Sequence, residues 1–78
     1  MLKIRDDIDL KELEKYGYSK SSMYGELSYN KDLEDGDTLA IIIDTRTLFL
    51  DAWEYNEKYL LEVADDLIKA DMVEKIDD

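Results

Sequence analysis

Cysteine, histidine and proline are all missing from this chain of 78 residues. Without cysteine the chain can form neither a disulfide framework nor a thiolate metal site. Without histidine it lacks the commonest general base and the commonest metal ligand. We therefore expect no metal site and no cofactor, and we rank an enzyme lowest among the possible classes of function.

Long apolar runs are missing as well. The longest is Leu39–Ile43, far below the roughly 20 residues of a membrane span. Residues 1–13 lack the apolar stretch of a secretion signal. These absences predict a soluble, cytoplasmic protein, and the short length predicts a single domain, residues 1–78, with a small core.

Acidic residues outnumber basic ones by 21 to 10, which gives a net charge of −11. Residues 1–20 hold five of each sign, residues 21–46 hold six acids and two bases, and residues 47–78 hold ten acids and three bases. Nucleic acids and anionic membranes bind cationic surfaces, so neither is expected as a direct partner. The imbalance favours a basic protein partner.

The first element predicted is a short helix over residues 9–16. Asp9 is a good N-cap, and Glu12 can complete a capping box. Gly17 stands where a left-handed C-terminal residue usually lies. Two turns are too short to be stable alone, so Leu10, Leu13 and Tyr16 must dock on a larger element.

Alternation with a period of two predicts three strands, at residues 22–30, 38–44 and 47–53. The first places Met23, Gly25, Leu27 and Tyr29 on one face. Asp35-Gly36 marks a tight turn before the second strand. Because no crossover helix fits between these segments, we expect an antiparallel meander.

A C-terminal helix is predicted from Glu57 to about residue 70, with Asn56 as its N-cap and an acidic side turned to water. A weaker pattern at Val73 and Ile76 indicates a short final strand. The fold class predicted is α+β, with a short N-terminal helix, a three-stranded antiparallel β-meander and a C-terminal amphipathic helix packed on the sheet. The apolar arc of that helix comprises Leu60, Leu61, Val63, Ala64, Leu67 and Ile68.

Two patterns of carboxylates could carry chemistry. Residues 31–42 resemble a calcium loop, but the ligand positions before Gly36 hold Lys31 and Leu33, so the match fails. Asp44 with Asp51, and Asp65 with Asp66, are pairs expected at turns or on exposed faces. Catalytic carboxylates usually lie in a cleft, so the sequence predicts no catalytic residues.

The aromatic residues fall into two groups. Tyr16 and Tyr29 fit core positions, whereas Tyr24, Phe49 and Trp53 fall on the sheet face opposite the aliphatic side chains. That second face is either covered by the N-terminal helix or exposed as a binding patch, since tyrosine and tryptophan are enriched at interfaces. Both alternatives remain open from sequence.

The acidic side of the C-terminal helix carries Glu62, Asp65 and Asp66. Such a stripe is most often a solvated face. Acids in the preceding loop can extend it into a larger negative surface that imitates the phosphates of nucleic acid; they are Asp32, Glu34, Asp35 and Asp37.

The two ends of the chain, MLKIRDDIDLKELEKYGY at residues 1–18 and LLEVADDLIKADMVEKID at residues 60–77, resemble small proteins encoded by phages, prophages and other mobile elements of low-GC Gram-positive bacteria. This group has largely no assigned activity, so the resemblance carries over no functional residue. It implies a genetic setting that includes anti-CRISPR proteins and other inhibitors of host nucleases, acting in the host cytoplasm.

Our leading hypothesis is a non-enzymatic, phage-type protein that binds a basic host protein, such as a nucleic-acid-binding nuclease, as an anti-CRISPR-like inhibitor and nucleic-acid mimic. The alternative is a structural or housekeeping interaction domain that forms a homodimer through a sheet edge or the aromatic face.

Overall fold

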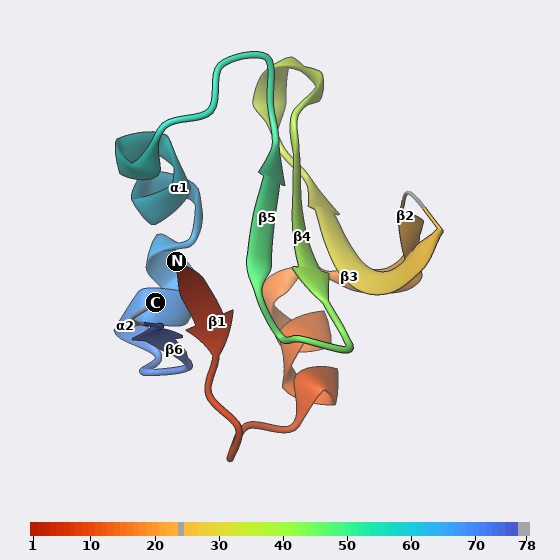
Figure 1. The fold of residues 1–78 in the computed structure, drawn as a ribbon, viewed down its shortest axis with the longest axis vertical. Coiled ribbons are helices and arrows are strands. Elements are labelled where there is room, and N and C mark those ends of the chain that lie inside the picture. The colour runs from red at the N-terminus through yellow and green to blue at the C-terminus, as the bar shows by residue number, and fades with distance from the viewer. Residues whose placement is uncertain (24, 77–78) are drawn as a thin grey trace.

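The computed structural model describes residues 1–23 and 25–76, with the backbone only for Met23 and Asp35. Its fold is α+β, and all of its strand pairings are antiparallel (Figure 1). Four strands form one sheet in the order β2-β3-β4-β5, and β1 pairs with β6 in a second sheet. The elements are β1 Leu2–Ile4, 3₁₀ helix η1 Leu10–Tyr16, β2 Ser19–Met23, β3 Glu26–Asp32, 3₁₀ helix η2 Glu34–Gly36, β4 Thr38–Ile42, β5 Leu48–Asp51, α1 Glu57–Val63, α2 Asp65–Lys69 and β6 Val73–Lys75.

The prediction of one strand over residues 22–30 is wrong, because this segment contains a turn. Gly25 has a φ of 82°, a left-handed conformation that glycine adopts without steric cost. The chain reverses there and pairs Met23 with Glu26 and Ser22 with Leu27. The meander therefore has four strands rather than three, and Leu27 is exposed.

β4 and β5 confirm the alternation expected of them. Leu39 pairs with Leu50 and Ile41 with Leu48, and all four side chains are buried on one face of the sheet. Both strands end earlier than predicted, at Ile42 and Asp51. The chain turns between them through Arg46, whose guanidinium donates to the carbonyls of Arg5 and Ile8 at 2.9 and 2.7 Å.

The sheet of β1 and β6 joins the two ends of the described chain (Figure 1). The weak prediction of a final strand is confirmed by β6, while β1 was not predicted. Ile4 is fully buried and Leu2 nearly so. A strand of three residues is too short to show a period of two, which is why the sequence pattern missed it.

The N-terminal helix is present with its predicted caps, but it is a 3₁₀ helix. The Asp9 carboxylate accepts from the backbone N–H of Lys11 at 3.0 Å, and Gly17 has a φ of 92°. Glu12 forms an ion pair with Lys15 at 2.7 Å. Leu13 is fully buried, with Leu10 and Tyr16 packed beside it, so the docking expected of this helix is confirmed.

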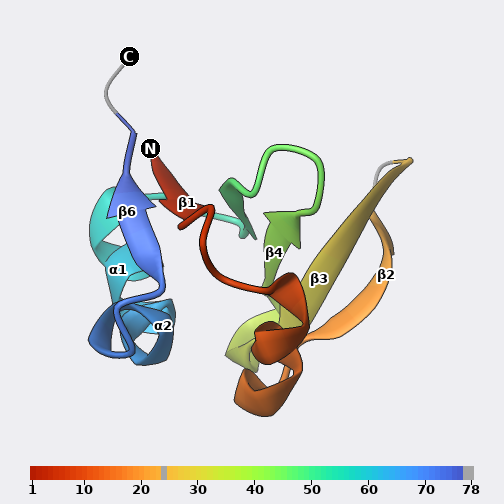
Figure 2. The same cartoon turned by 90° about the horizontal axis from the view of Figure 1, so that it is seen from below.

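The predicted C-terminal helix is divided at Ala64 into α1 and α2. Its buried stripe is narrower than predicted. Of the predicted apolar arc, Leu60, Ala64 and Leu67 are buried in the small core, whereas Leu61 and Ile68 are exposed. The predicted arrangement of one helix laid on a meander is also wrong. α1 and α2 lie beside β1 and β6 on one side of the molecule, and the four-stranded sheet lies on the other side. η1 lies at one end of the molecule (Figure 2).

Among the described residues, no helix combines the length and the apolar character that crossing a membrane would require.

Candidate functional site

A hydrogen bond brings the loop between β3 and β4 against α1. The Tyr59 hydroxyl donates to a carboxylate oxygen of Asp37 at 2.8 Å, across 22 residues of sequence. Asp37 is partly buried, and Tyr59 packs against the core. This contact holds one of the loop acids, Asp37, against α1.

A second contact ties β3 to α2. The Lys31 ammonium lies 3.4 Å from a carboxylate oxygen of Asp66 and 5.4 Å from the centre of the Tyr18 ring. Another oxygen of Asp66 accepts from the backbone N–H of Leu67 at 2.8 Å. Asp66 is partly buried, with 37% of its side chain exposed, so it faces water only in part.

Tyr18 lies under this ion pair with only 3% of its surface exposed. Burial raises the pKa of its hydroxyl, and the negative charge of Asp66 raises it further. The Tyr18 hydroxyl therefore stays neutral and adds no second negative charge beside Asp66. Its ring packs in the core and makes a cation–π contact with Lys31.

The remaining acids of this region are exposed. Asp32 accepts from the Thr38 hydroxyl at 3.4 Å, Asp65 pairs with Lys69 at 2.9 Å, and Glu34 and Glu62 are exposed. The side chain of Asp35 lies outside the described part. We use the name acidic surface for six acids. Three lie between the end of β3 and the start of β4, and three lie on α1 and α2; they are Asp32, Glu34, Asp37, Glu62, Asp65 and Asp66.

Most basic side chains are engaged in ion pairs, two of them with acids of the acidic surface. Six of the ten lie within 4.0 Å of a carboxylate, and they are Lys3, Arg5, Lys15, Lys31, Lys69 and Lys75. Exposed ion pairs of this kind contribute little to stability. Glu34 and Glu62 are exposed and take part in none of the pairs named above, so their charge adds to the acidic surface.

The aromatic residues predicted as a patch are placed differently. Phe49 is exposed on β5 to 45%, and Trp53, exposed to 97%, lies in the loop after β5 rather than on the sheet. The alternative in which η1 covers them is therefore wrong for these two. Tyr24 lies outside the described residues.

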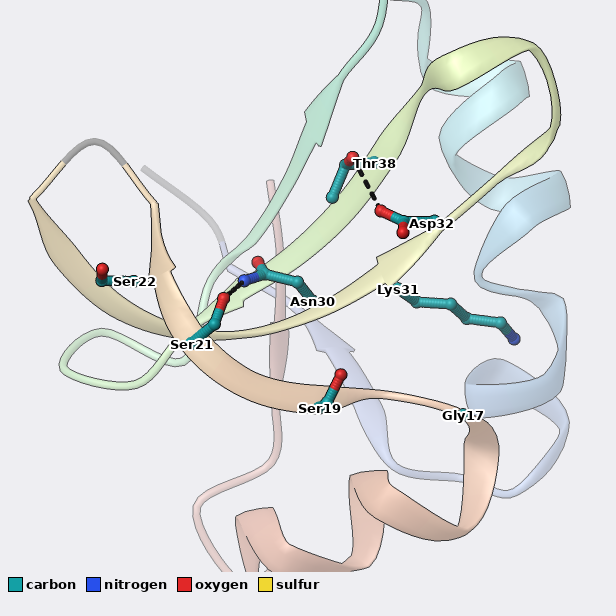
Figure 3. Close-up of a pocket in the computed structure, with 8 residues that line it drawn as sticks. All are labelled: Gly17, Ser19, Ser21, Ser22, Asn30, Lys31, Asp32 and Thr38. Carbon is teal, nitrogen blue, oxygen red and sulfur yellow. Dashed lines mark hydrogen bonds between the residues drawn. The ribbon is translucent and has the colours of Figure 1, made fainter.

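A polar hollow of about 620 Å³ opens beside β2 and β3 (Figure 3). Asn30 donates through its amide to the Ser21 hydroxyl and accepts from the buried Ser28 hydroxyl at 3.0 Å. An amide N–H cannot take up a proton, so this contact does not activate Ser21 as a nucleophile. The other lining residues are Gly17, Ser19, Ser22, Lys31, Asp32 and Thr38.

The two predicted carboxylate pairs do not form a cleft. Asp44 is exposed in the turn after β4, while Asp51 ends β5. Within residues 1–23 and 25–76, no group of three or more carboxylates is arranged to hold a metal ion.

No protein-family model, no curated protein and no solved structure matches this chain. A functional proposal therefore depends on the chemistry of the surface. Sequence reasoning missed Lys31, Tyr18 and Tyr59 as the residues that position this surface, and their contacts with Asp66 and Asp37 span too many residues for any local pattern to predict them.

Proposed function

We propose that this protein is a non-enzymatic binding protein whose acidic surface docks onto a basic protein. The observation that carries the proposal is that two contacts hold the acid-bearing segments on neighbouring elements. Tyr59 of α1 bonds Asp37 in the segment after β3, and Lys31 of β3 pairs with Asp66 of α2. Glu62 is exposed and stands in α1 one helical turn after Tyr59, so it lies beside the Tyr59–Asp37 contact.

The charge of the whole molecule supports the same function. A net charge of −11 attracts a cationic partner from a distance and raises the rate of association. The acids of the surface then set the orientation of the complex. Affinity comes from short-range contacts, since exposed charges alone contribute little.

The biological role proposed is inhibition of a basic host protein by occupation of its nucleic-acid-binding site, in the manner of an anti-CRISPR protein. Spaced carboxylates can satisfy the lysines and arginines that otherwise bind phosphates. The phage setting rests on the resemblance of residues 1–18 and 60–77 alone. The target is therefore proposed by its chemistry, as a nucleic-acid-binding protein such as a nuclease.

The proposal is tested by charge reversal at three exposed positions, with Glu34→Lys, Glu62→Lys and Asp65→Lys combined. Asp66 is left unchanged because its ion pair with Lys31 is part of the fold. Partners are captured from host lysate at low and at high salt. We expect the wild type to capture a basic nucleic-acid-binding protein at low salt, and the variant to lose it.

A matched control reverses three exposed acids elsewhere, with Glu14→Lys, Glu26→Lys and Asp44→Lys. It changes the net charge by the same amount and should lose much less binding. Equal loss in both variants would show that only net charge matters. Self-association with no captured partner would instead support the homodimeric, structural alternative.

A further inference from the structure

An apolar hollow opens where β1 and β5 separate. β1 meets the residue before β5 at a bridge between Lys3 and Thr47, supported by a hydrogen bond of 2.8 Å from the Ile4 N–H to the Arg46 carbonyl. The hollow beyond that bridge has a volume of about 520 Å³. It is lined by Met1, Leu2, Leu48, Phe49, Leu50, Tyr55 and Leu60.

The floor and the rim of this hollow differ in exposure. Leu2, Leu48, Leu50 and Leu60 are 4–8% exposed and belong to the core. The rim residues Met1, Phe49 and Tyr55 are 66%, 45% and 61% exposed. Three of the seven exposed large apolar side chains of the described residues thus surround one opening into the core.

Acidic residues and a tryptophan are close neighbours of the rim residue Tyr55 in the sequence. Tyr55 lies in the loop between β5 and α1, where Trp53 is 97% exposed and Glu54 is exposed. Glu57, at the start of α1, is also exposed and lies 4.0 Å from Lys75. An exposed indole attracts lysine and arginine through its ring face, and the carboxylates attract the same cations.

We infer that this hollow receives an apolar side chain that a basic protein partner presents between lysine or arginine residues. The inference rests on the proposed function and names the second part of the recognition surface. The floor supplies apolar contact area, whereas Glu54 and Glu57 offset the charge of the flanking cations and Trp53 contacts them through its ring face. A few buried apolar contacts inside a polar rim carry most of the affinity in protein interfaces.

A second copy of this chain fits the hollow less well. Two molecules of net charge −11 repel each other. A basic partner removes that repulsion. Charge complementarity therefore selects a partner of opposite charge over self-association at this site.

The test uses two short peptides that differ at one position. One carries a leucine flanked by arginines, and the other carries alanine in place of that leucine. Binding is followed at low salt by NMR of the leucine methyl groups and by the emission of Trp53, the one tryptophan of the chain. We expect the leucine peptide to bind about tenfold more tightly, to shift the methyl signals of Leu48, Leu50 and Leu60, and to move the Trp53 emission to shorter wavelength.

Equal binding of the two peptides, or shifts that avoid the hollow, would overturn the inference while leaving a charge-based function intact. Failure of both peptides and of the lysate capture would contradict the proposed function as well. These two outcomes are separate, because the alanine peptide reports charge alone.

Variants locate the site independently. Tyr55→Ser, in the exposed loop, should weaken the leucine peptide about fivefold and leave the alanine peptide unchanged. Phe49→Ser adds a second position on the rim. The matched control is Leu27→Ser, which removes an apolar side chain of 59% exposure outside the hollow, and an equal effect of this control would overturn the assignment.

Discussion

Leu67 has no exposed surface and lies in the core beside Leu60 and Ala64. Leu67→Ala would leave a cavity there, and we expect a loss of about 2–4 kcal/mol in the free energy of unfolding. Urea denaturation followed by circular dichroism measures the loss. Leu61→Ala, on the exposed side of α1, should change stability by less than about 0.5 kcal/mol. Similar losses in the two variants would contradict the assignment of the buried helix face.

Tyr18 predicts a response to alkaline pH. Its hydroxyl is buried without a hydrogen-bond partner among the described residues, and its pKa is raised by burial and by Asp66. Stability is therefore complete below about pH 10, the ordinary tyrosine value, and falls above it, because the unfolded chain releases a proton that the folded chain retains. The decline is at most about 1.4 kcal/mol per pH unit.

Tyr18→Phe removes both the titration and the unpartnered hydroxyl. We expect this variant to be as stable as the wild type or more so at pH 7, and to lose less stability between pH 10 and 11. Denaturation curves at the two pH values give the comparison. An alkaline decline that is unchanged in the variant would assign the effect to another group.

Individual residues also show what sequence could not decide about the site. Asp65 and Asp66 are adjacent and were both predicted to face water. Asp65 is exposed, but Asp66 meets Lys31, 35 residues earlier. The difference comes from a tertiary contact, and charge patterning along a helix contains no information about it.

At the scale of the element, the cap of η1 is the most direct test. Asp9→Ala removes the acceptor of the Lys11 N–H, and we expect a cost of about 1 kcal/mol in the free energy of unfolding. Asp9→Asn and Asp9→Ser keep an acceptor and should restore most of the stability. If the alanine variant is as stable as the wild type, the Asp9 cap of η1 contributes little to the free energy of unfolding.

Elements with a strong period were predicted well, and elements defined by contacts were not. β4 and β5 follow their alternating pattern because one face is buried. The pattern of residues 22–30 continues unchanged through Gly25, so it hides a reversal of the chain. The cap residues Asp9 and Gly17 were predicted correctly, but such residues can cap a 3₁₀ helix as readily as an α-helix. Tertiary packing decides between them.

At the scale of the molecule, the excess of acids predicts stabilisation by salt. The folded chain holds a net charge of −11 within extents of 32 × 25 × 25 Å, and screening weakens this repulsion. We expect the midpoint of urea unfolding to rise between about 10 mM and about 0.5 M NaCl, because the screening length falls over this range from about 30 Å to well below about 10 Å.

The variant with Glu14→Lys, Glu26→Lys and Asp44→Lys serves as the control for this effect. Each substitution adds two charge units, so the net charge changes from −11 to −5, and the salt-dependent rise should be smaller. A midpoint that falls with salt in the wild type would show that the ion pairs outweigh the general repulsion.

The pairing of β1 with β6 sets an order of events during protein synthesis. β1 leaves the ribosome before β6, which follows only after residues 5–72 have been made. Leu2 and Ile4, which are buried in the described fold, lack the cover of β6 throughout that interval. We therefore expect a copy whose synthesis stops before Val73 to leave β1 without its paired strand, an apolar edge of the kind that chaperones and proteases recognise.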